Sequence, residues 1–113
     1  MNEEIKNILA NLVVDSQAID VAHLKYEGKK DTYIVWTMLP EEPLLAYDDE
    51  LEYSLTQVDI DIYSKGNYLN ILNEIKNRMK NNGWTWTEDS EEMYEEDTKL
   101  YHRTSTFEKE RKL

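Results

Sequence analysis

A chain of 113 residues, 40% of them hydrophobic and 11% aromatic, has room for one domain with one core. The absence of cysteine excludes disulfide frameworks, thiolate metal sites and thiol catalysis. Twenty-four acids against thirteen Lys and Arg residues give a formal net charge of −11. Because nucleic-acid binding depends on cations that neutralise phosphates, this charge disfavours sequence-specific DNA or RNA recognition.

The remaining sequence signals disfavour a membrane location. No apolar run approaches the roughly 20 residues that a membrane helix needs. Glu3 and Glu4 stand where a signal peptide would carry positive charge. We therefore expect neither membrane insertion nor export.

The first third of the chain predicts a helix followed by a β-hairpin. Residues 3–14 carry one apolar stripe at helical spacing, which Asp15 and Ser16 interrupt. Residues 18–25 and 32–39 flank a polar loop with one glycine, as the two strands of a hairpin do. The second of these strands is apolar on both faces, so we expect it to lie in the middle of a sheet.

Residues 40–50 predict a loop, because two prolines end the preceding strand. Leu44, Leu45 and Tyr47 are unusually apolar for a solvated loop. Two interpretations stay open: these side chains pack on the domain's own core, or they form a mobile arm that docks on a neighbouring subunit. Together with Trp36 of the preceding strand, they are the candidate assembly contacts.

Residues 51–63 predict a long strand with a change of phase. Val58, Ile60 and Ile62 alternate with Asp59 and Asp61, as a half-buried strand requires. The apolar positions before residue 56 have the opposite parity. We therefore expect a β-bulge or a sharp bend at residues 56–57.

The last part predicts a helix over residues 68–82, with Asn67 as its N-cap and Gly83 just beyond its end. A strand over 84–87, an acidic connection over 88–97 and a strand over 99–109 follow. The predicted order is α-β-β-β-α-β-β. We expect an α+β fold over residues 1–113, a single domain whose mostly antiparallel sheet packs against two helices.

No pattern in the chain indicates catalysis. Asp59 and Asp61 could share a divalent ion, but no further acid or lysine follows at a spacing typical of a nuclease. His23 and His102 have no recognisable nucleophile, and the acids of residues 88–97 lack the alternation and glycine of a calcium loop. We expect no enzymatic activity, no metal site and no cofactor.

The order of these elements resembles that of a known family. The resemblance lies in the strand Tyr33-Ile34-Val35-Trp36 after its glycine loop, in the strand over 57–63 that runs through a turn into a helix, and in the closing segment 94–107. Together these segments resemble the tail-completion proteins of long-tailed bacteriophages and of prophages in Gram-positive bacteria. These proteins are also called tail-terminator or head-tail joining proteins.

The resemblance implies a structural virion protein with an α/β fold, whose sheet is mixed or antiparallel and flanked by helices. Such proteins assemble into a ring, commonly a hexamer, that caps the finished tail tube and meets the head connector. The partners would be further copies of the chain, the tail-tube protein and the connector protein. The location would be the head–tail interface of the virion, reached from the host cytoplasm during assembly. The family marks no site residue by a motif.

An acidic lumen would suit a ring through which DNA must slide without adhering. Candidate lumen residues are Asp48, Asp49, Asp59 and Asp61. The alternative hypothesis is a small acidic inhibitor, either an immunity protein or a DNA mimic, that occupies a basic nuclease. The charge of −11, the small size and the pair Trp84 and Trp86 also fit that class.

Overall fold

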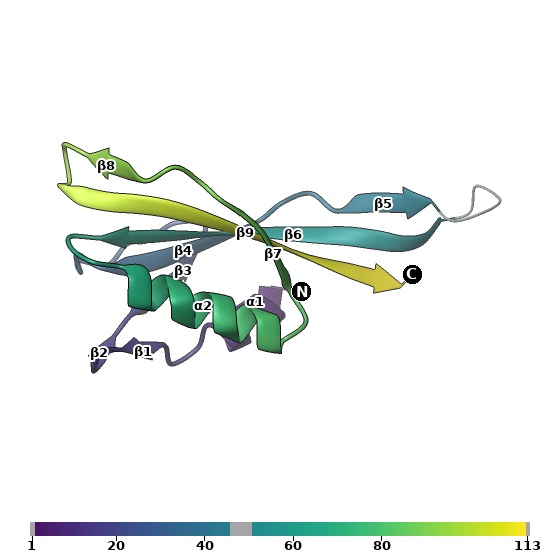
Figure 1. The fold of residues 1–113 in the computed structure, drawn as a ribbon, viewed down its shortest axis with the longest axis horizontal. Helices are drawn as coiled ribbons and strands as arrows, with labels where there is room; N and C mark the ends of the chain where they lie inside the picture. Colours follow the sequence, from purple (N-terminus) through teal and green to yellow (C-terminus); the bar gives the residue numbers. More distant parts are fainter. Residues whose placement is uncertain (1, 46–50, 113) are drawn as a thin grey trace.

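Two long antiparallel strands dominate the computed structural model, which describes residues 2–45 and 51–112. β6 (Leu51–Ser64) and β9 (Leu100–Lys112) pair without interruption from Tyr53 opposite Lys112 to Ser64 opposite Tyr101. They form the middle of a sheet with strand order β3-β4-β6-β9-β7 (Figure 1). Two further strands lie beside this path, β5 next to β6 and β8 next to β9. The bounds of the shorter strands are β3 (Asp20–His23), β4 (Tyr33–Met38), β5 (Glu42–Leu45), β7 (Thr85–Asp89) and β8 (Met93–Glu95).

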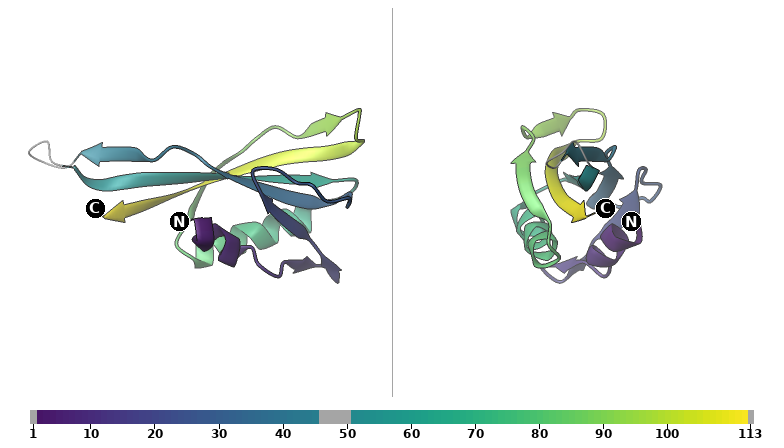
Figure 2. Two further views of the ribbon diagram at one scale, coloured as in Figure 1. Left: turned by 180° about the vertical axis from the view of Figure 1, so that it is seen from behind. Right: turned by 90° about the vertical axis from the view of Figure 1, so that its right-hand side faces the viewer.

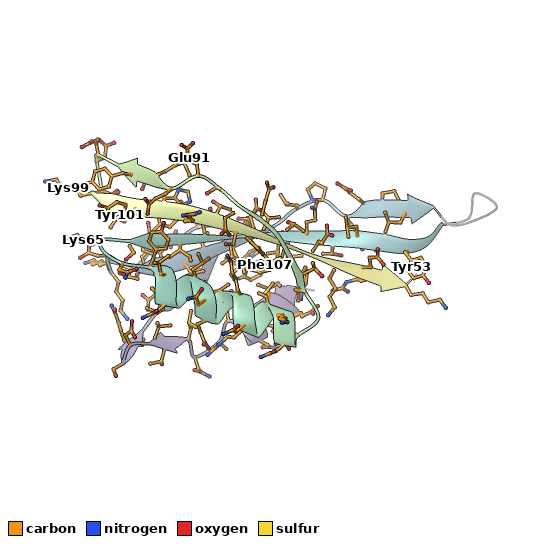
Figure 3. All side chains as sticks on the ribbon, viewed as in Figure 1. Tyr53, Lys65, Glu91, Lys99, Tyr101 and Phe107 are labelled. Atoms are coloured by element: carbon orange, nitrogen blue, oxygen red, sulfur yellow. The ribbon has the colours of Figure 1, made fainter. Side chains whose placement is uncertain are left out.

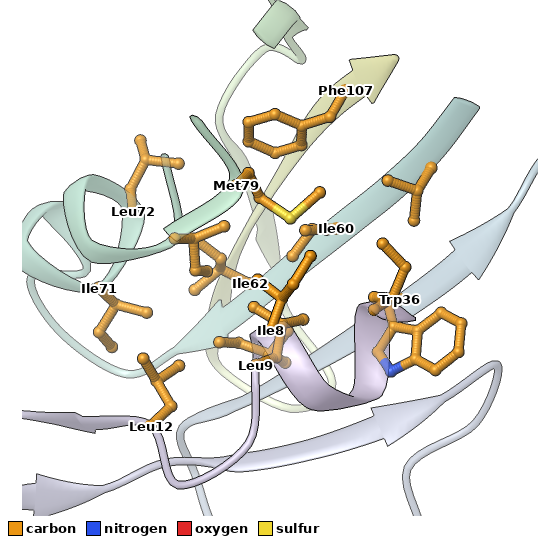
Figure 4. Close-up of a cluster of buried hydrophobic side chains, with 14 of the residues drawn as sticks. Ile8, Leu9, Leu12, Trp36, Ile60, Ile62, Ile71, Leu72, Met79 and Phe107 are labelled. Atoms are coloured by element: carbon orange, nitrogen blue, oxygen red, sulfur yellow. The ribbon is translucent and has the colours of Figure 1, made fainter. Parts of the chain in front are cut away.

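Two helices cover one face of this sheet, α1 (Asn2–Ile8) and α2 (Leu69–Asn81) (Figures 1 and 2). The core lies between them and the sheet, where Ile60 and Phe107 meet Leu9 and Met79 (Figure 4). All four side chains are fully buried. The predicted α+β class is confirmed: the sheet is mostly antiparallel and both helices pack against it.

Helix α2 lies where its caps and its stripe predict. The Leu69 N–H donates to Asn67 Oδ1 (3.0 Å), which satisfies one of the free donors at the start of the helix. Gly83 adopts φ +87° and the Trp84 N–H donates to the Met79 carbonyl (3.0 Å), the bonding of a Schellman cap. The whole predicted stripe is buried: Tyr68, Leu72, Ile75 and Met79.

Helix α1 is shorter than predicted, because it ends at Ile8 rather than at residue 14. A two-stranded hairpin of β1 (Val13–Val14) and β2 (Gln17–Ala18) takes the place of its last turns. Asp15 and Ser16 both have positive φ (51° and 64°), as the two central residues of a type I′ turn require. Leu9 and Leu12 lie in the core although they follow the helix. The apolar spacing therefore predicted which residues are buried, but the predicted helix was too long.

The predicted hairpin of residues 18–25 and 32–39 is wrong, because β3 pairs with β4 in parallel. The connection over residues 24–32 carries the chain back to the end of the sheet where β3 begins. Tyr26 holds this connection in place: its ring stacks on Tyr33 (4.0 Å between centroids) and its hydroxyl donates to Asp20 (2.8 Å). The expectation that the second strand lies centrally is confirmed, since β4 lies between β3 and β6.

The predicted bulge at Thr56 and Gln57 is also wrong. The ladder between β6 and β9 is continuous there, so Tyr53 and Leu55 lie on the face opposite to Ile60. The apolar positions of β6 move from one face of the sheet to the other because different elements pack against the strand along its length. Near Ile60 the helices cover one face, whereas near Tyr53 no helix is present and β5 packs alongside.

Residues 40–50 are not wholly a loop, because β5 forms within them and pairs antiparallel with β6. The β5–β6 ladder shifts register between Leu44 and Leu45, whose partners are Tyr53 and Leu51, so the extra residue lies in β6 at position 52 and not at residues 56–57. With β1, β2, β5 and β8, the order of elements contains four short strands beyond the predicted α-β-β-β-α-β-β.

Glu4 joins α1 to the end of β9. Its carboxylate accepts hydrogen bonds from Lys109 Nζ (2.7 Å), Arg111 Nη2 (2.9 Å) and Trp84 Nε1 (3.1 Å). Partial burial by itself would raise the pKa of Glu4. The hydrogen bonds from Lys109 and Trp84 and the charges of Lys109 and Arg111 outweigh it, so the pKa lies below its usual value.

The two turn glycines should respond differently to Ala. Gly83→Ala forces an L residue into the left-handed region and should lower the free energy of unfolding by about 1 kcal/mol. Gly66→Ala is the matched control, because no atom lies within 4 Å of the added Cβ and the φ there is not positive. Chemical denaturation of both variants measures the difference, and equal stability would contradict the cap.

The hydrogen bonds and ion pairs of Glu4 should make the free energy of unfolding depend on pH. The pKa of Glu4 is lower in the folded protein than its unfolded value near 4.5. The contribution of Glu4 to the free energy of unfolding is therefore present above pH 4.5 and is lost as the pH falls through the folded-state pKa. The stability difference between wild type and Glu4→Gln should therefore shrink between pH 6 and pH 3. Glu3→Gln, at an exposed position of the same helix, serves as the control. A difference that stays constant with pH would refute this role of Glu4.

Candidate assembly surfaces

The sheet continues beyond the helices as an arm, which we define as β5 with residues 53–57 of β6 and 108–112 of β9 (Figures 1 and 2). The arm accounts for the elongated shape of the molecule, whose extents are 52 × 27 × 23 Å. Tyr53 marks its far part, whereas Lys65 and Lys99 lie at the opposite end of the long axis (Figure 3).

One side of the arm carries three apolar side chains, Leu44, Tyr53 and Leu55, which we call the arm face. The charged residues Glu42, Glu110 and Lys112 lie beside them on the same side of the sheet, opposite Leu55 and Tyr53. Leu44 lies directly opposite Tyr53 in the ladder, and Leu55 is the next residue on the same side of β6. Leu44 and Leu55 are half-buried and Tyr53 is 37% exposed. Of the other candidate contacts, Leu45 pairs through its backbone with Leu51, and Tyr47 lies outside the described residues.

The other side of the arm is polar. Ser54 and Thr56 are buried there, and the Ser54 hydroxyl donates to Glu41 (2.6 Å). Pro43 has no N–H to offer from β5, and this makes the outer edge of the arm a poor template for a further strand. The arm therefore presents a side-chain face rather than an open edge.

A second surface, which we call the edge groove, runs between α1, residues 9–13 and β3. Its volume is about 810 Å³. Its apolar lining includes Leu9, Leu12, Val13, Val21 and Trp36, and the charged residues of the wall are Glu3, Lys6 and Asp20. Within residues 2–45 and 51–112, β3 pairs on one side only, so the groove adjoins an edge of the sheet.

Trp36 is not the exposed contact that its apolar strand predicts. It is only 3% exposed, and its ring stacks on His23 with 4.0 Å between centroids. Trp36 belongs to the core and reaches the surface only as part of the groove lining.

The two candidate lumen acids in β6 lie side by side on the sheet face that points away from the helices. Asp59 accepts a hydrogen bond from the Thr106 hydroxyl (2.6 Å), and Asp61 Oδ1 lies 2.8 Å from His102 Nε2. Both are half-buried, with the Asp61 side chain 20% exposed. Asp48 and Asp49, the other two candidates, lie outside the described residues. A lumen role for these acids stays a prediction.

The same face carries a ladder of stacked rings that sequence reasoning missed. Tyr26, Tyr33, Tyr63 and His102 stack in this order, with centroid separations of 4.0, 4.8 and 4.2 Å. Burial, with the nearby charge of Asp61, raises the pKa of Tyr63 to about 12. No local pattern could have indicated this ladder, because its rings come from one loop and three strands that only the register brings together.

The predicted acidic connection over residues 88–97 begins with the last two residues of β7 and includes β8. Asp89 is tied down by Lys76 Nζ (3.0 Å) and by the Ser105 hydroxyl. Burial would raise its pKa, but these bonds and one from Trp86 lower it. The side chains nearer β8 are open: Met93 is 44%, Tyr94 47% and Tyr101 36% exposed. Acidic and aromatic groups thus share one end of the molecule (Figure 3).

The described residues contain no group of three or more His, Asp or Glu side chains placed to hold a metal ion. No helix within residues 2–45 and 51–112 is both long and apolar enough to cross a membrane. A comparison of the chain with protein-family models found no match, and a comparison with curated proteins found none either.

Gly28→Ala tests whether Tyr26 holds the aromatic ladder. A Cβ at residue 28 would collide with the Tyr26 hydroxyl, so the ring should leave its place against Tyr33. The loss of one stacked pair should lower stability by about 1 kcal/mol. It should also shift the NMR signals of the Tyr33 ring. Tyr26→Phe keeps the ring and loses the hydroxyl, which donates to Asp20 and accepts from the Lys30 N–H (3.1 Å), so it should leave those ring signals nearly unchanged. Unaltered Tyr33 signals in Gly28→Ala would contradict the ladder.

Proposed function

We propose that this protein is a structural subunit of a long-tailed phage or prophage virion. Copies of it form a ring that caps the finished tail tube and meets the head connector. The observation that carries the proposal is the arm, a stiff extension of the sheet that reaches beyond the helices and carries an apolar face. The sequence segments 33–36, 57–63 and 94–107, which resemble those of tail-completion proteins, favour the same class.

The arm favours assembly over a solitary role. Its ladder continues that of the core, so it projects as part of one sheet and cannot fold back onto its own helices. Apolar side chains on such a projection are costly in water unless another surface covers them. A contact in which one subunit's projection meets a different surface of the next is heterologous, and it closes into a ring when the rotation allows.

The charge of the protein suits a DNA conduit. A net charge of −11 repels the phosphate backbone, so a channel lined by this protein would let duplex DNA pass without adhering. Asp59 and Asp61 are held in place by hydrogen bonds on one sheet face, which suits a fixed acidic wall.

A second candidate function is inhibition of a basic nuclease. The observation that favours it is the acidic connection, where Tyr94 and Tyr101 stand exposed beside carboxylates. Aromatic anchors within a charged face are typical of tight protein inhibitors of this kind. Such an inhibitor would act as a monomer on one partner.

Sedimentation over a salt series separates the two functions. Ring formation should strengthen as salt screens the repulsion between identical acidic subunits. The Debye length of the solution falls to about 10 Å at 0.1 M salt. An inhibitor should stay monomeric and lose affinity for its basic partner as salt rises. The wild-type protein should bind no duplex DNA even at low salt, and it should associate with purified tail tubes. The virion role would be refuted if the protein stayed monomeric at every salt concentration and did not bind tail tubes.

A further inference from the structure

We propose that the arm face of one copy docks into the edge groove of the next copy. This inference rests on the proposed ring and names the two surfaces that build it. It assigns the groove, which is open among residues 2–45 and 51–112, to a second copy of this protein.

The two surfaces match in chemistry. Leu44, Tyr53 and Leu55 present apolar side chains on a projecting sheet, and the groove offers an apolar lining with Val13 at its rim, 56% exposed. A volume of about 810 Å³ lies in the range that encloses a drug-sized ligand, so the groove has room for several side chains. Burying both surfaces removes apolar area that a monomer leaves in water.

The arm face and the edge groove of one chain cannot contact each other. The arm face belongs to the unbroken ladder of β6 and β9, which points away from α1 and the groove (Figures 1 and 2). Because the arm and the groove are different patches of one molecule, their contact is heterologous and repeats from copy to copy.

One pair of opposite charges can join the two surfaces. Of the charged residues in the groove wall, Asp20 is already paired with Lys30 (3.1 Å), and Glu3 and Lys6 remain. Lys6 is exposed and makes no ion pair with any described residue. Glu42 on β5 is likewise exposed and without an ion pair in that part of the chain. Docking the arm face into the groove would bring an acid to a cation, and the pair would orient the arm.

A charge-reversal pair tests the contact. Lys6→Glu and Glu42→Lys should each weaken self-association roughly three- to tenfold in Kd, because like charges then meet. The double variant should restore it. Lys80→Glu, at an exposed helix position away from both surfaces, is the control for the loss of a cation. Sedimentation equilibrium at the lowest salt concentration at which wild type associates measures all four proteins against wild type, and thermal melting confirms that each is folded.

A second pair of variants tests the apolar part. Tyr53→Ser on the arm face and Val13→Glu at the groove rim should each weaken self-association by more than tenfold, since aromatic anchors dominate interfaces. Met93→Ser removes a comparable exposed side chain at the other end of the molecule and should have no effect. A mixture of Tyr53→Ser and Val13→Glu should form only dimers, because each intact arm can meet only one intact groove.

The outcomes separate this inference from the proposed function. If wild type forms rings and the Lys6, Glu42, Tyr53 and Val13 variants form them equally well, the arm-and-groove contact is refuted and the ring role stands. If these variants form rings normally but fail to bind tail tubes, the occupant of the groove is the tail-tube protein and not a second copy. A wild type that neither associates nor binds tail tubes overturns both.

Discussion

The pairing of β6 with β9 is the interaction on which the rest of the structure depends. One continuous ladder serves two halves of the molecule that are covered in different ways. In one half, Ile60 and Phe107 bury their side chains under the helices. In the other, the same strands leave the helices and form the arm. The rigidity of a hydrogen-bonded ladder is what allows an apolar face to stand away from its own core.

Glu4 lies where these two halves meet. It binds Lys109 and Arg111 on β9 and Trp84 just after α2, so it fastens the first helix, the second helix and the start of the arm together. Charged hydrogen bonds that are partly shielded from solvent are stronger than exposed ones. The direction in which the arm leaves the domain is therefore set by a network rather than by β6 and β9 alone.

The net charge is unevenly distributed along the sequence. Residues 41–52 contain six acids and no cation, and residues 88–97 contain seven acids and no cation. The described parts of these segments belong to opposite ends of the long axis (Figure 1). The proposed contact between the arm face and the edge groove would place Glu42 near Lys6, in a wall that also contains Glu3 and Asp20. Repulsion between copies then remains as a long-range term that salt and the apolar contact must overcome.

The sequence by itself determined the parts of this protein that depend on local chemistry. Gly83 can adopt a positive φ at the end of α2, and Asn67 can accept a hydrogen bond at its start, so that helix was predictable nearly to the residue. The core stripe of α2 and the central place of β4 followed from apolar spacing. The candidate contacts were less predictable, since Trp36 proved to be a core residue and Leu44 part of a strand.

Only the tertiary structure decided which strand lies beside which, and what covers each face. Alternation of apolar residues is the same in a parallel and an antiparallel strand, so it could not reveal that Tyr26 returns the chain to make β3 and β4 parallel. The change in the alternation of apolar residues before Val58 is the same whether the backbone forms a bulge or the elements that pack on β6 change from one face to the other. The aromatic ladder, the arm face and the edge groove all arise from register and from the reach of the sheet. These are properties of pairing between distant segments, which no local pattern encodes.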